Sequence, residues 1–344
     1  MPVNPAAKLV QNLLDLKSIE QKPTRNGYGE ALARAGEEDP RIVALCADLT
    51  ESTRTELFAK KFPERFIEIG VAEQNLATVA SGMAAVGKIP FISSYAMFSP
   101  GRNWEQIRTT ICYNNQNVKI IGAHSGVSVG PDGATHQAIE DIAIMRPIPN
   151  MTILVPSDVE EARKATMAAA KFEGPVYLRF TREKTPVFTT DATPFEIGKA
   201  EIFWDAAPKT IGGSTSDSRL DVAIIGCGPL MHNAILAAAE LEKEGLAVRV
   251  INCPSVKPLD DATILEAAQD AGAVVTVEEH QITGGLGGAI AEYLARAFPV
   301  PIEFVGVQNR FGESGNPNEL IEHFGMGVSH IIEAVKHVIG RKPA

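Results

Sequence analysis

The amino-acid sequence predicts an α/β protein built from two three-layer α/β/α domains with mostly parallel sheets. Short β-rich runs such as "RIVALCADL", "KIPFISSY" and "NVKIIGAH" alternate with helical runs from about residue 25 to 182. This alternation is typical of parallel strands joined by helices that cover both faces of a sheet. A second alternating unit extends from "DVAIIGCG" to "PIEFVGV", and the length of 344 residues exceeds the usual size of one domain.

Changes in composition divide the chain into four expected segments. Residues 1–20 read as an amphipathic N-terminal arm, 21–188 as the first domain, 189–219 as a linker and 220–344 as the second domain. The linker is rich in Thr, Asp, Pro, Gly and Ser, although "EIGKAEIFW" within it has the composition of a strand. In the second domain, apolar residues repeat along one face of residues 328–339, which predicts a C-terminal helix.

The composition argues against several classes of protein. A net charge of −10 without a basic run argues against nucleic acid and anionic membrane surfaces as partners. The sequence contains no stretch of eighteen purely apolar residues, so we expect no membrane span, and the N-terminus lacks a secretory signal pattern. The four cysteines are far apart and lack CxxC spacing, which favours a reducing cytoplasm over a disulfide framework or a zinc site.

Two glycine-rich stretches suggest ligands without specifying them. "IIGCGPL" begins like a dinucleotide-binding turn, but Met231 stands in place of the third glycine and no acidic residue ends the next strand. These departures argue against a nicotinamide cofactor. "TGGLGG", from Thr283, is either an anion-binding helix start or a close-packing turn.

A polar loop in "AHSGVSVGPDGATHQAIEDI" is the first candidate site. It follows a predicted strand and contains His124, Asp132 and His136, and ligands in open α/β sheets gather at the carboxyl ends of strands. The three side chains could form a two-histidine, one-carboxylate metal site. They could instead hold the hydroxyl groups of a sugar, or simply satisfy the backbone of their own loop.

Charged and aromatic residues follow two other strands. "VYLRFTREKTP" places Arg179 and Arg182 at the end of the sixth strand, on the same side of the sheet, where guanidinium groups would suit a phosphate. The alternative is ordinary surface ion pairing with residues such as Glu183. Tyr95 and Phe98 end another strand, where aromatic residues serve equally well in a core.

Glu73 raises the question of what keeps a carboxylate in apolar surroundings. It begins "EQNLATVASGMAAVG", an almost unbroken apolar run that predicts a helix buried on most sides, and the next basic residue is Lys88. The alternative is an exposed glutamate that caps its own helix.

Together these stretches resemble the C-terminal half of transketolase, a thiamine-diphosphate enzyme that moves two-carbon ketol units between sugar phosphates. The resemblance runs from about Thr24 to the end and is carried by "TRNGYGE", "CADLTEST", "EIGVAEQN", "YAMF", "VGPDGATHQ", "TRE" and "VEEH…GGLGG". It implies a pyrimidine-binding domain followed by a C-terminal domain, acting in the pentose phosphate pathway.

The resemblance also implies a partner. Full-length transketolases have a preceding domain that binds the diphosphate and Mg²⁺ or another divalent metal through a GDG motif followed by Asn, and this sequence contains no such motif. We therefore expect a split enzyme in which a separate diphosphate-binding subunit completes the site. Self-association through both domains of this chain would give an α2β2 heterotetramer.

The family's glutamate corresponds to Glu73, which donates a hydrogen bond to the cofactor's pyrimidine ring and must therefore keep or share a proton. Burial disfavours its charged form, whereas the helix start favours that form. Arg102 stands near a position where many members carry a tyrosine. The resemblance implies further cofactor contacts from Tyr95, Phe98, Asp48 and Leu49, substrate contacts from Arg25, Ser52, His124, Asp132, His136 and Arg182, a place for His136 beside the reacting carbon, and no metal ligand in this chain.

Alternatives of three kinds to a transketolase subunit remain: related thiamine-diphosphate enzymes, a scaffold and a metal hydrolase. A deoxyxylulose-phosphate synthase and the beta subunit of a 2-oxoacid dehydrogenase share the fold and the glutamate, and His124 in "AHSG" favours transketolase over both. A non-enzymatic scaffold would have little need to keep Asp132 and His136 together. A metal hydrolase would use His124, Asp132 and His136 as ligands.

Overall fold

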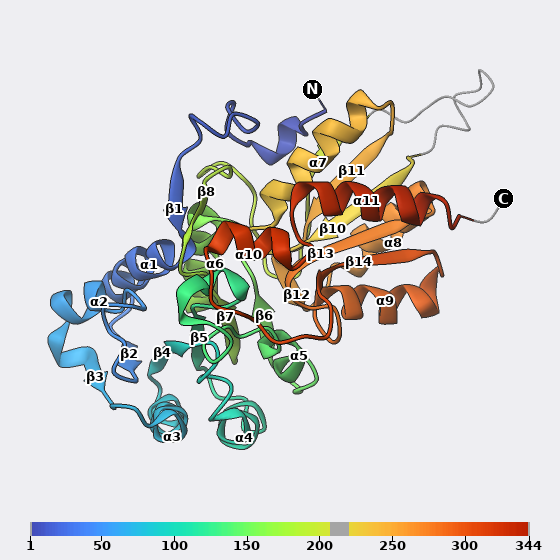
Figure 1. Ribbon diagram of the computed structural model, residues 1–344. Coiled ribbons are helices and arrows are strands. Elements are labelled where there is room, and N and C mark those ends of the chain that lie inside the picture. Colours follow the sequence, from blue (N-terminus) through green and yellow to red (C-terminus); the bar gives the residue numbers. More distant parts are fainter. Residues whose placement is uncertain (1, 207–219, 343–344) are drawn as a thin grey trace.

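The computed structural model describes residues 2–206 and 220–342 and contains two mostly parallel sheets with helices against them (Figure 1). The first sheet runs in the order β12 (Ser255–Lys257), β6 (Thr152–Leu154), β7 (Val176–Arg179), β5 (Lys119–Ala123), β4 (Ile89–Tyr95), β2 (Ile42–Cys46) and β3 (Phe66–Glu68). All of its strand pairs are parallel except that between β12 and β6.

The second sheet has five strands. It runs in the order β14 (Ile302–Val307), β13 (Val274–Gln281), β10 (Val222–Gly226), β11 (Val248–Asn252) and β9 (Glu201–Asp205), and only β9 is antiparallel to its neighbour. The strand β9 lies within the expected linker, whose residues 207–219 are outside the described part of the chain.

Helices cover the first sheet on both faces. One face carries α1 (Thr24–Glu38) and α6 (Val159–Lys171), and the other carries α3 (Glu73–Ala85) and the π-helical η3 (Ile107–Cys112). Shorter elements lie in the connections: α2 (Glu56–Lys61), η2 (Pro63–Arg65), α4 (Trp104–Gln106), η4 (Val127–Asp132) and α5 (Asp141–Met145).

The second sheet is covered in the same way. Its two faces pack against α7 (Met231–Lys243) with α11 (Val328–Ile339), and against α8 (Asp261–Ala271) with α9 (Leu286–Ala297), while α10 (Pro317–His323) lies beside η4. One continuous core joins α3 and η3 of the first domain to α8 and α9 of the second. The two domains therefore share buried apolar surface.

These observations confirm the predicted fold class, and every strand quoted from the two alternating units is present. The C-terminal helix spans Val328–Ile339 as predicted. Two strand pairings were not predicted: β1 (Gln21–Pro23) pairs with β8 (Lys184–Pro186), and β12 of the second half joins the first sheet.

The prediction for α3 needs a correction. Its buried residues in this chain are Glu73, Leu76, Ala77, Ala80 and Ser81, which lie on one face, rather than on most sides as expected. Spacings of three and four residues place these side chains on a single helical stripe. The apolar run thus includes an outward-facing part that this chain does not cover.

The N-terminal arm lies against the second domain. Its short helix η1 (Pro5–Ala7) is capped by Asn4, whose backbone N–H donates to the Phe203 carbonyl at 3.0 Å. Figure 1 shows this blue segment running beside α7. Leu13 of the arm is buried in the same core cluster as Phe203.

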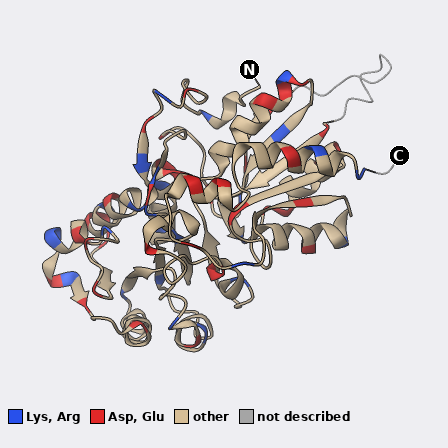
Figure 2. Cartoon of the chain, viewed as in Figure 1, with Lys and Arg blue, Asp and Glu red and all other residues tan. Residues whose placement is uncertain are grey.

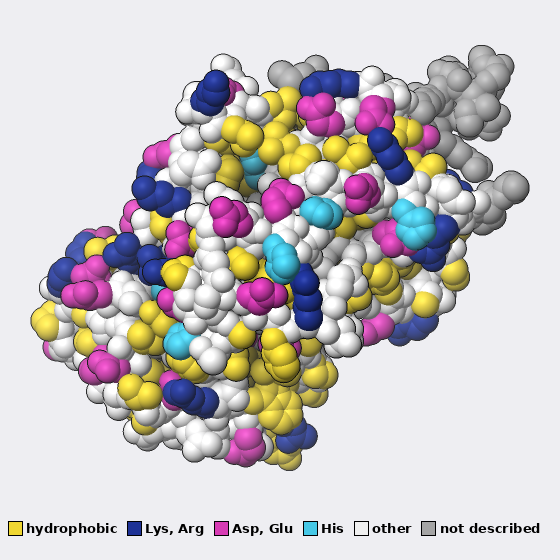
Figure 3. All heavy atoms as spheres, in the orientation of Figure 1, with side chains coloured by type: hydrophobic (Ala, Val, Ile, Leu, Met, Phe, Trp, Pro, Cys, Tyr) yellow, Lys and Arg dark blue, Asp and Glu magenta, His cyan; other side chains and the backbone are white. Residues whose placement is uncertain are grey.

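Charged residues of both signs are scattered along the chain (Figure 2), and their side chains intermingle over the face seen in Figure 3, which shows no continuous basic surface. Among the described residues, no helix has both the length and the apolar character needed to cross a bilayer.

Candidate active site

The site is organised by the carboxyl edge of the first sheet. Because β2, β4, β5 and β7 are parallel, the loops that follow them emerge at the same edge. Asp48, Tyr95, His124 and Arg182 lie at or just after the ends of these strands. This topology brings together residues that are up to 134 positions apart in the sequence.

The loop after β2 is held by a residue that the sequence analysis did not select. Glu68, at the end of the neighbouring strand β3, accepts hydrogen bonds from the backbone N–H of Asp48 at 2.7 Å and of Gly70 at 2.9 Å. Asp48 has a left-handed backbone with φ +58°. Leu49 follows, half-buried, and its carbonyl accepts a bond from the Thr53 N–H. The sequence signal that could have identified Glu68 was its position at the end of a strand that pairs with β2.

Aromatic rings form a continuous group at this edge. The Tyr95 ring stacks on His124 with a centroid separation of 3.9 Å and lies 6.1 Å from the Phe98 ring. His136 meets Phe98 edge-on at 5.3 Å and lies 6.3 Å from Tyr95. The loop that carries His136 is thus folded back onto the predicted aromatic residues.

A basic cluster joins this group through Arg25. Its Nη1 donates to His124 Nε2 at 3.2 Å and to the Ser52 carbonyl at 2.7 Å, which ties three of the predicted substrate contacts together. Burial, reinforced by the positive charges of Arg25 and Arg182, lowers the pKa of His124 to about 3. The neutral ring that accepts from Arg25 carries its proton on Nδ1, an atom that is buried and has no partner among the described residues.

Arg182 and Asp132 complete the loop side of the site. Arg182 Nη1 donates to the Val129 carbonyl at 2.9 Å and pairs with Glu183 at 3.2 Å, so it braces η4. Asp132 ends η4 and is exposed, and its carboxylate makes no hydrogen bond or ion pair with any residue that the structure describes. Its carboxylate is therefore available to a ligand.

The second domain supports the same loop. Gln137 is buried, and its Nε2 donates to the Val127 carbonyl at 2.9 Å and to the Glu313 carbonyl at 2.8 Å. Gln137 was not among the predicted site residues, although it belongs to the "VGPDGATHQ" stretch that carries the family resemblance.

Arg179 does not share the surroundings of Arg182. Its guanidinium is buried and forms an ion pair with the buried Asp141 at 2.8 Å, and it donates to the Ala138 and Glu279 carbonyls. The expectation that both arginines face a phosphate from the same side is wrong for Arg179. Its Nε and Nη2 groups donate to partners inside the protein, so Arg179 acts as a structural clamp between the two domains.

Glu73 is buried, with 4 % of its surface exposed, at the first position of α3. Its oxygens lie 3.0 and 3.2 Å from Arg102 Nη1. The same guanidinium lies over the Phe98 ring, 4.1 Å from its centroid. The carboxylate and the aromatic ring assigned to the pyrimidine therefore face a common space, and Arg102 supplies the base that the local sequence around Glu73 lacks.

The metal-site interpretation receives no support from this geometry. Among residues 2–206 and 220–342, no group of three His, Cys, Asp or Glu side chains is arranged to hold a metal ion. His124 Nε2 is engaged by Arg25, and Asp132 is exposed.

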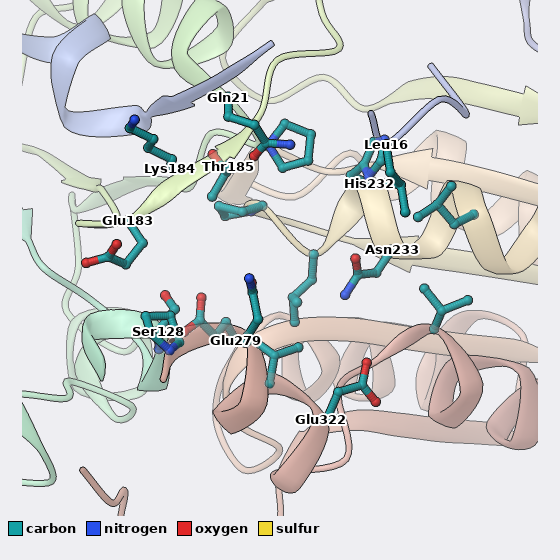
Figure 4. Close-up of a pocket in the computed structure, with 18 residues that line it drawn as sticks. Leu16, Gln21, Ser128, Glu183, Lys184, Thr185, His232, Asn233, Glu279 and Glu322 are labelled. Atoms are coloured by element: carbon teal, nitrogen blue, oxygen red, sulfur yellow. Dashed lines mark hydrogen bonds between the residues drawn. The ribbon is translucent and has the colours of Figure 1, made fainter. Parts of the chain in front are cut away.

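A separate cavity of about 490 Å³ lies between the N-terminal arm, β8, α7 and α10. Figure 4 shows Ser128 and Glu279 on one wall, with His232 and Asn233 opposite. None of the predicted site residues is among its described lining residues, although Glu183, the ion-pair partner of Arg182, lines it.

Comparison with known proteins assigns the family. A family model described as transketolase, pyrimidine binding domain, matches residues 20–187, and a second, transketolase, C-terminal domain, matches residues 214–331. A protein of Methanocaldococcus jannaschii named putative transketolase C-terminal section is 40% identical over 317 residues, covering 91% of this chain and 95% of that protein. Human transketolase is 36% identical over 318 residues, and the chain spans 49% of its length.

A solved structure agrees with these sequence relatives. The structure titled "Split gene transketolase, inactive beta4 tetramer" superposes with a TM-score of 0.84 at 44% identity, covering 93% of this chain and 99% of that one. The chain belongs to the transketolase family, of which it carries the pyrimidine-binding and C-terminal domains.

Proposed function

We propose that this chain is the C-terminal subunit of a two-chain transketolase, which transfers a two-carbon ketol unit from a ketose phosphate to an aldose phosphate. The observation that carries the proposal is the buried Glu73, which contacts the same Arg102 guanidinium as the Phe98 ring inside a transketolase pyrimidine-binding domain. Relatives that correspond to this half alone support the split arrangement.

The residues present fit the pyrimidine ring of thiamine diphosphate. Arg102 places a planar group with N–H donors between the Glu73 carboxylate and the Phe98 ring. An aminopyrimidine is also planar and has nitrogen atoms at its edge, so the same two contacts suit it. Phe98 and Tyr95 would orient the ring, Glu73 would hold a proton at its edge, and Asp48 and Leu49 would border it.

When bound, thiamine diphosphate supplies the nucleophilic carbon that accepts and releases the two-carbon unit. This chain contributes orientation, a dry pocket and the proton of Glu73. His136 lies against Phe98 and would stand beside the reacting carbon. Mg²⁺ or another divalent metal would be held by the partner subunit.

The basic cluster suits the phosphate of the sugar. Burial, followed by the neighbouring charges of Arg54 and Arg182, lowers the pKa of Arg25, so a bound anion would relieve repulsion among these guanidinium groups. Arg25, Arg182, Ser52 and the neutral His124 would contact the phosphate, and the unpaired Asp132 would accept from a sugar hydroxyl.

We further propose an α2β2 assembly with a diphosphate-binding subunit, working in the cytoplasm in the pentose phosphate pathway. A structural relative is titled an inactive β4 tetramer, which supports both self-association and the need for a partner. All four cysteines are free and buried, in keeping with a reducing compartment. Light scattering of the co-expressed chains tests the stoichiometry.

The test of function is Glu73→Gln in the assembled complex. We expect unchanged assembly and a loss of turnover of roughly 10²-fold or more, since positioned proton transfer contributes about this much. Ketol transfer from xylulose 5-phosphate to ribose 5-phosphate is the measured rate, and pyruvate as donor tests the synthase and dehydrogenase alternatives. Glu105→Gln, an exposed carboxylate in α4, is the control. Activity equal to wild type in Glu73→Gln would refute the role of Glu73.

A further inference from the structure

Arg102 occupies the space that the proposed function assigns to the cofactor's ring. One guanidinium pairs with Glu73 at 3.0 Å and covers the Phe98 ring at 4.1 Å. Aromatic rings stack with centroids 4.5–7 Å apart, so a pyrimidine on this face of Phe98 would overlap the guanidinium. The two groups cannot use Glu73 and Phe98 at the same time.

This pair differs from an ordinary surface ion pair. Glu73 has 4 % of its side chain exposed, whereas the Arg102 side chain is 50 % exposed. Among the described residues, Arg102 is the hydrogen-bonding partner of the Glu73 carboxylate. A buried carboxylate without a partner is costly, so the contact with Arg102 compensates for the burial of Glu73.

The backbone around Arg102 is fixed while its side chain has room to move. The Arg102 N–H donates to the Phe98 carbonyl at 2.8 Å. The buried Asn103 donates to the Glu73 carbonyl at 3.0 Å and to Ser99 Oγ at 3.1 Å. Rotation of the half-exposed arginine side chain toward solvent therefore opens the pocket without unfolding the loop.

We propose that Arg102 is a movable cover of the pyrimidine pocket, which the cofactor must displace. The proposal rests on the proposed function. In the covered state, Arg102 shields the Glu73 carboxylate and one face of the Phe98 ring. In the uncovered state, that face accepts the pyrimidine ring of the cofactor. Arg102 thus weakens and slows cofactor binding, and removing its side chain should strengthen binding.

The experiment uses the full chain in complex with the diphosphate-binding subunit. Equilibrium dialysis with thiamine diphosphate and Mg²⁺ measures affinity, and stopped-flow fluorescence measures the loading rate. We expect Arg102→Ala to bind roughly 5- to 20-fold more tightly, because a partly exposed ion pair and a cation–π contact no longer compete. The affinity of Arg102→Lys should lie between those of the wild type and Arg102→Ala, since an ammonium pairs with Glu73 but covers the Phe98 ring less well.

The matched control is Arg108→Ala, which removes an exposed arginine from η3 and should leave affinity unchanged. In a Glu73→Gln background the Arg102→Ala gain should shrink, because the ion pair is gone and only the cation–π contact over Phe98 still competes. Equal affinity of Arg102→Ala and wild type, or weaker binding by Arg102→Ala, would overturn the proposal. Absence of binding by the wild-type complex would instead refute the proposed function.

Discussion

His124 shows how one residue serves several neighbours at once. Its backbone is left-handed, with φ +55°, its ring stacks on Tyr95, and its Nε2 accepts from Arg25. Burial and the adjacent arginines keep the ring neutral. A neutral imidazole beside guanidinium groups can contact an anion without adding to the charge repulsion.

The lowered pKa of His124, about 3, predicts a pH dependence of stability. An unfolded histidine binds its proton near pH 6.5, so between pH 3 and 6.5 the unfolded chain binds the additional proton. Stability should therefore fall as the pH drops below 6.5, by up to about 1.4 kcal/mol per pH unit from this residue. The His124→Gln variant should lack this contribution to the dependence of stability on pH.

Urea unfolding of the two proteins between pH 7 and pH 4.5, in chloride buffers without phosphate, measures the difference. Other titrating groups are common to both proteins and cancel in the comparison. Parallel stability curves would show that His124 protonates normally in the folded chain.

At the scale of the element, α6 shows how a helix start can also join segments. Asp158 accepts from the Glu161 N–H at 2.9 Å as the N-cap of the helix, and from the Phe188 and Thr189 N–H groups at 2.9 and 2.6 Å. One buried carboxylate thus anchors the helix and the segment that follows β8. The local sequence could not predict the distant partners of this cap, at Phe188 and Thr189.

We expect Asp158→Ala to destabilise the chain by roughly 3 kcal/mol or more, because several buried N–H donors lose their acceptor. Asn316→Ala removes the exposed cap of α10 and should cost about 1 kcal/mol. Chemical denaturation of both variants measures these losses. Equal losses would mean that the contacts beyond the helix contribute little.

Strand prediction succeeded for apolar runs and failed for short polar segments. The parallel strands are buried apolar runs that only a sheet covered on both faces accommodates. By contrast, β1, β8 and β12 are three-residue segments of mostly polar composition, QKP, KTP and SVK, which lack an apolar run. Their pairing depends on where the rest of the chain brings them.

At the scale of the whole molecule, the two domains are joined by buried polar contacts as well as by a shared core. Arg179 pairs with Asp141 and reaches the Glu279 carbonyl of the second domain. The strand β12 adds residues of the second half to the first sheet. These contacts hold the loop that carries His124, Asp132 and His136 between the domains.

Replacing Arg179 by Met should destabilise the chain by roughly 3–5 kcal/mol, since Asp141 is left as an uncompensated buried charge. Arg146→Met is the control, because Arg146 also joins the domains but pairs with the exposed Glu292. Its loss should cost about 1 kcal/mol or less. Guanidinium denaturation measures both, and a loss below 1 kcal/mol for Arg179→Met would contradict the clamp.

The amino-acid sequence by itself determined the strands of the two alternating units, their parallel architecture and the strand ends at which Tyr95, His124 and Arg182 lie, because these follow from local apolar patterns and a topological rule. Only the tertiary structure decided that Arg102 pairs with Glu73 and that Arg179 is buried against Asp141. The physical reason is that a charged group pairs with the opposite charge that lies near it in the folded chain, whatever their separation in the sequence. Packing sets those distances between segments 29 and 38 residues apart, which no local pattern records.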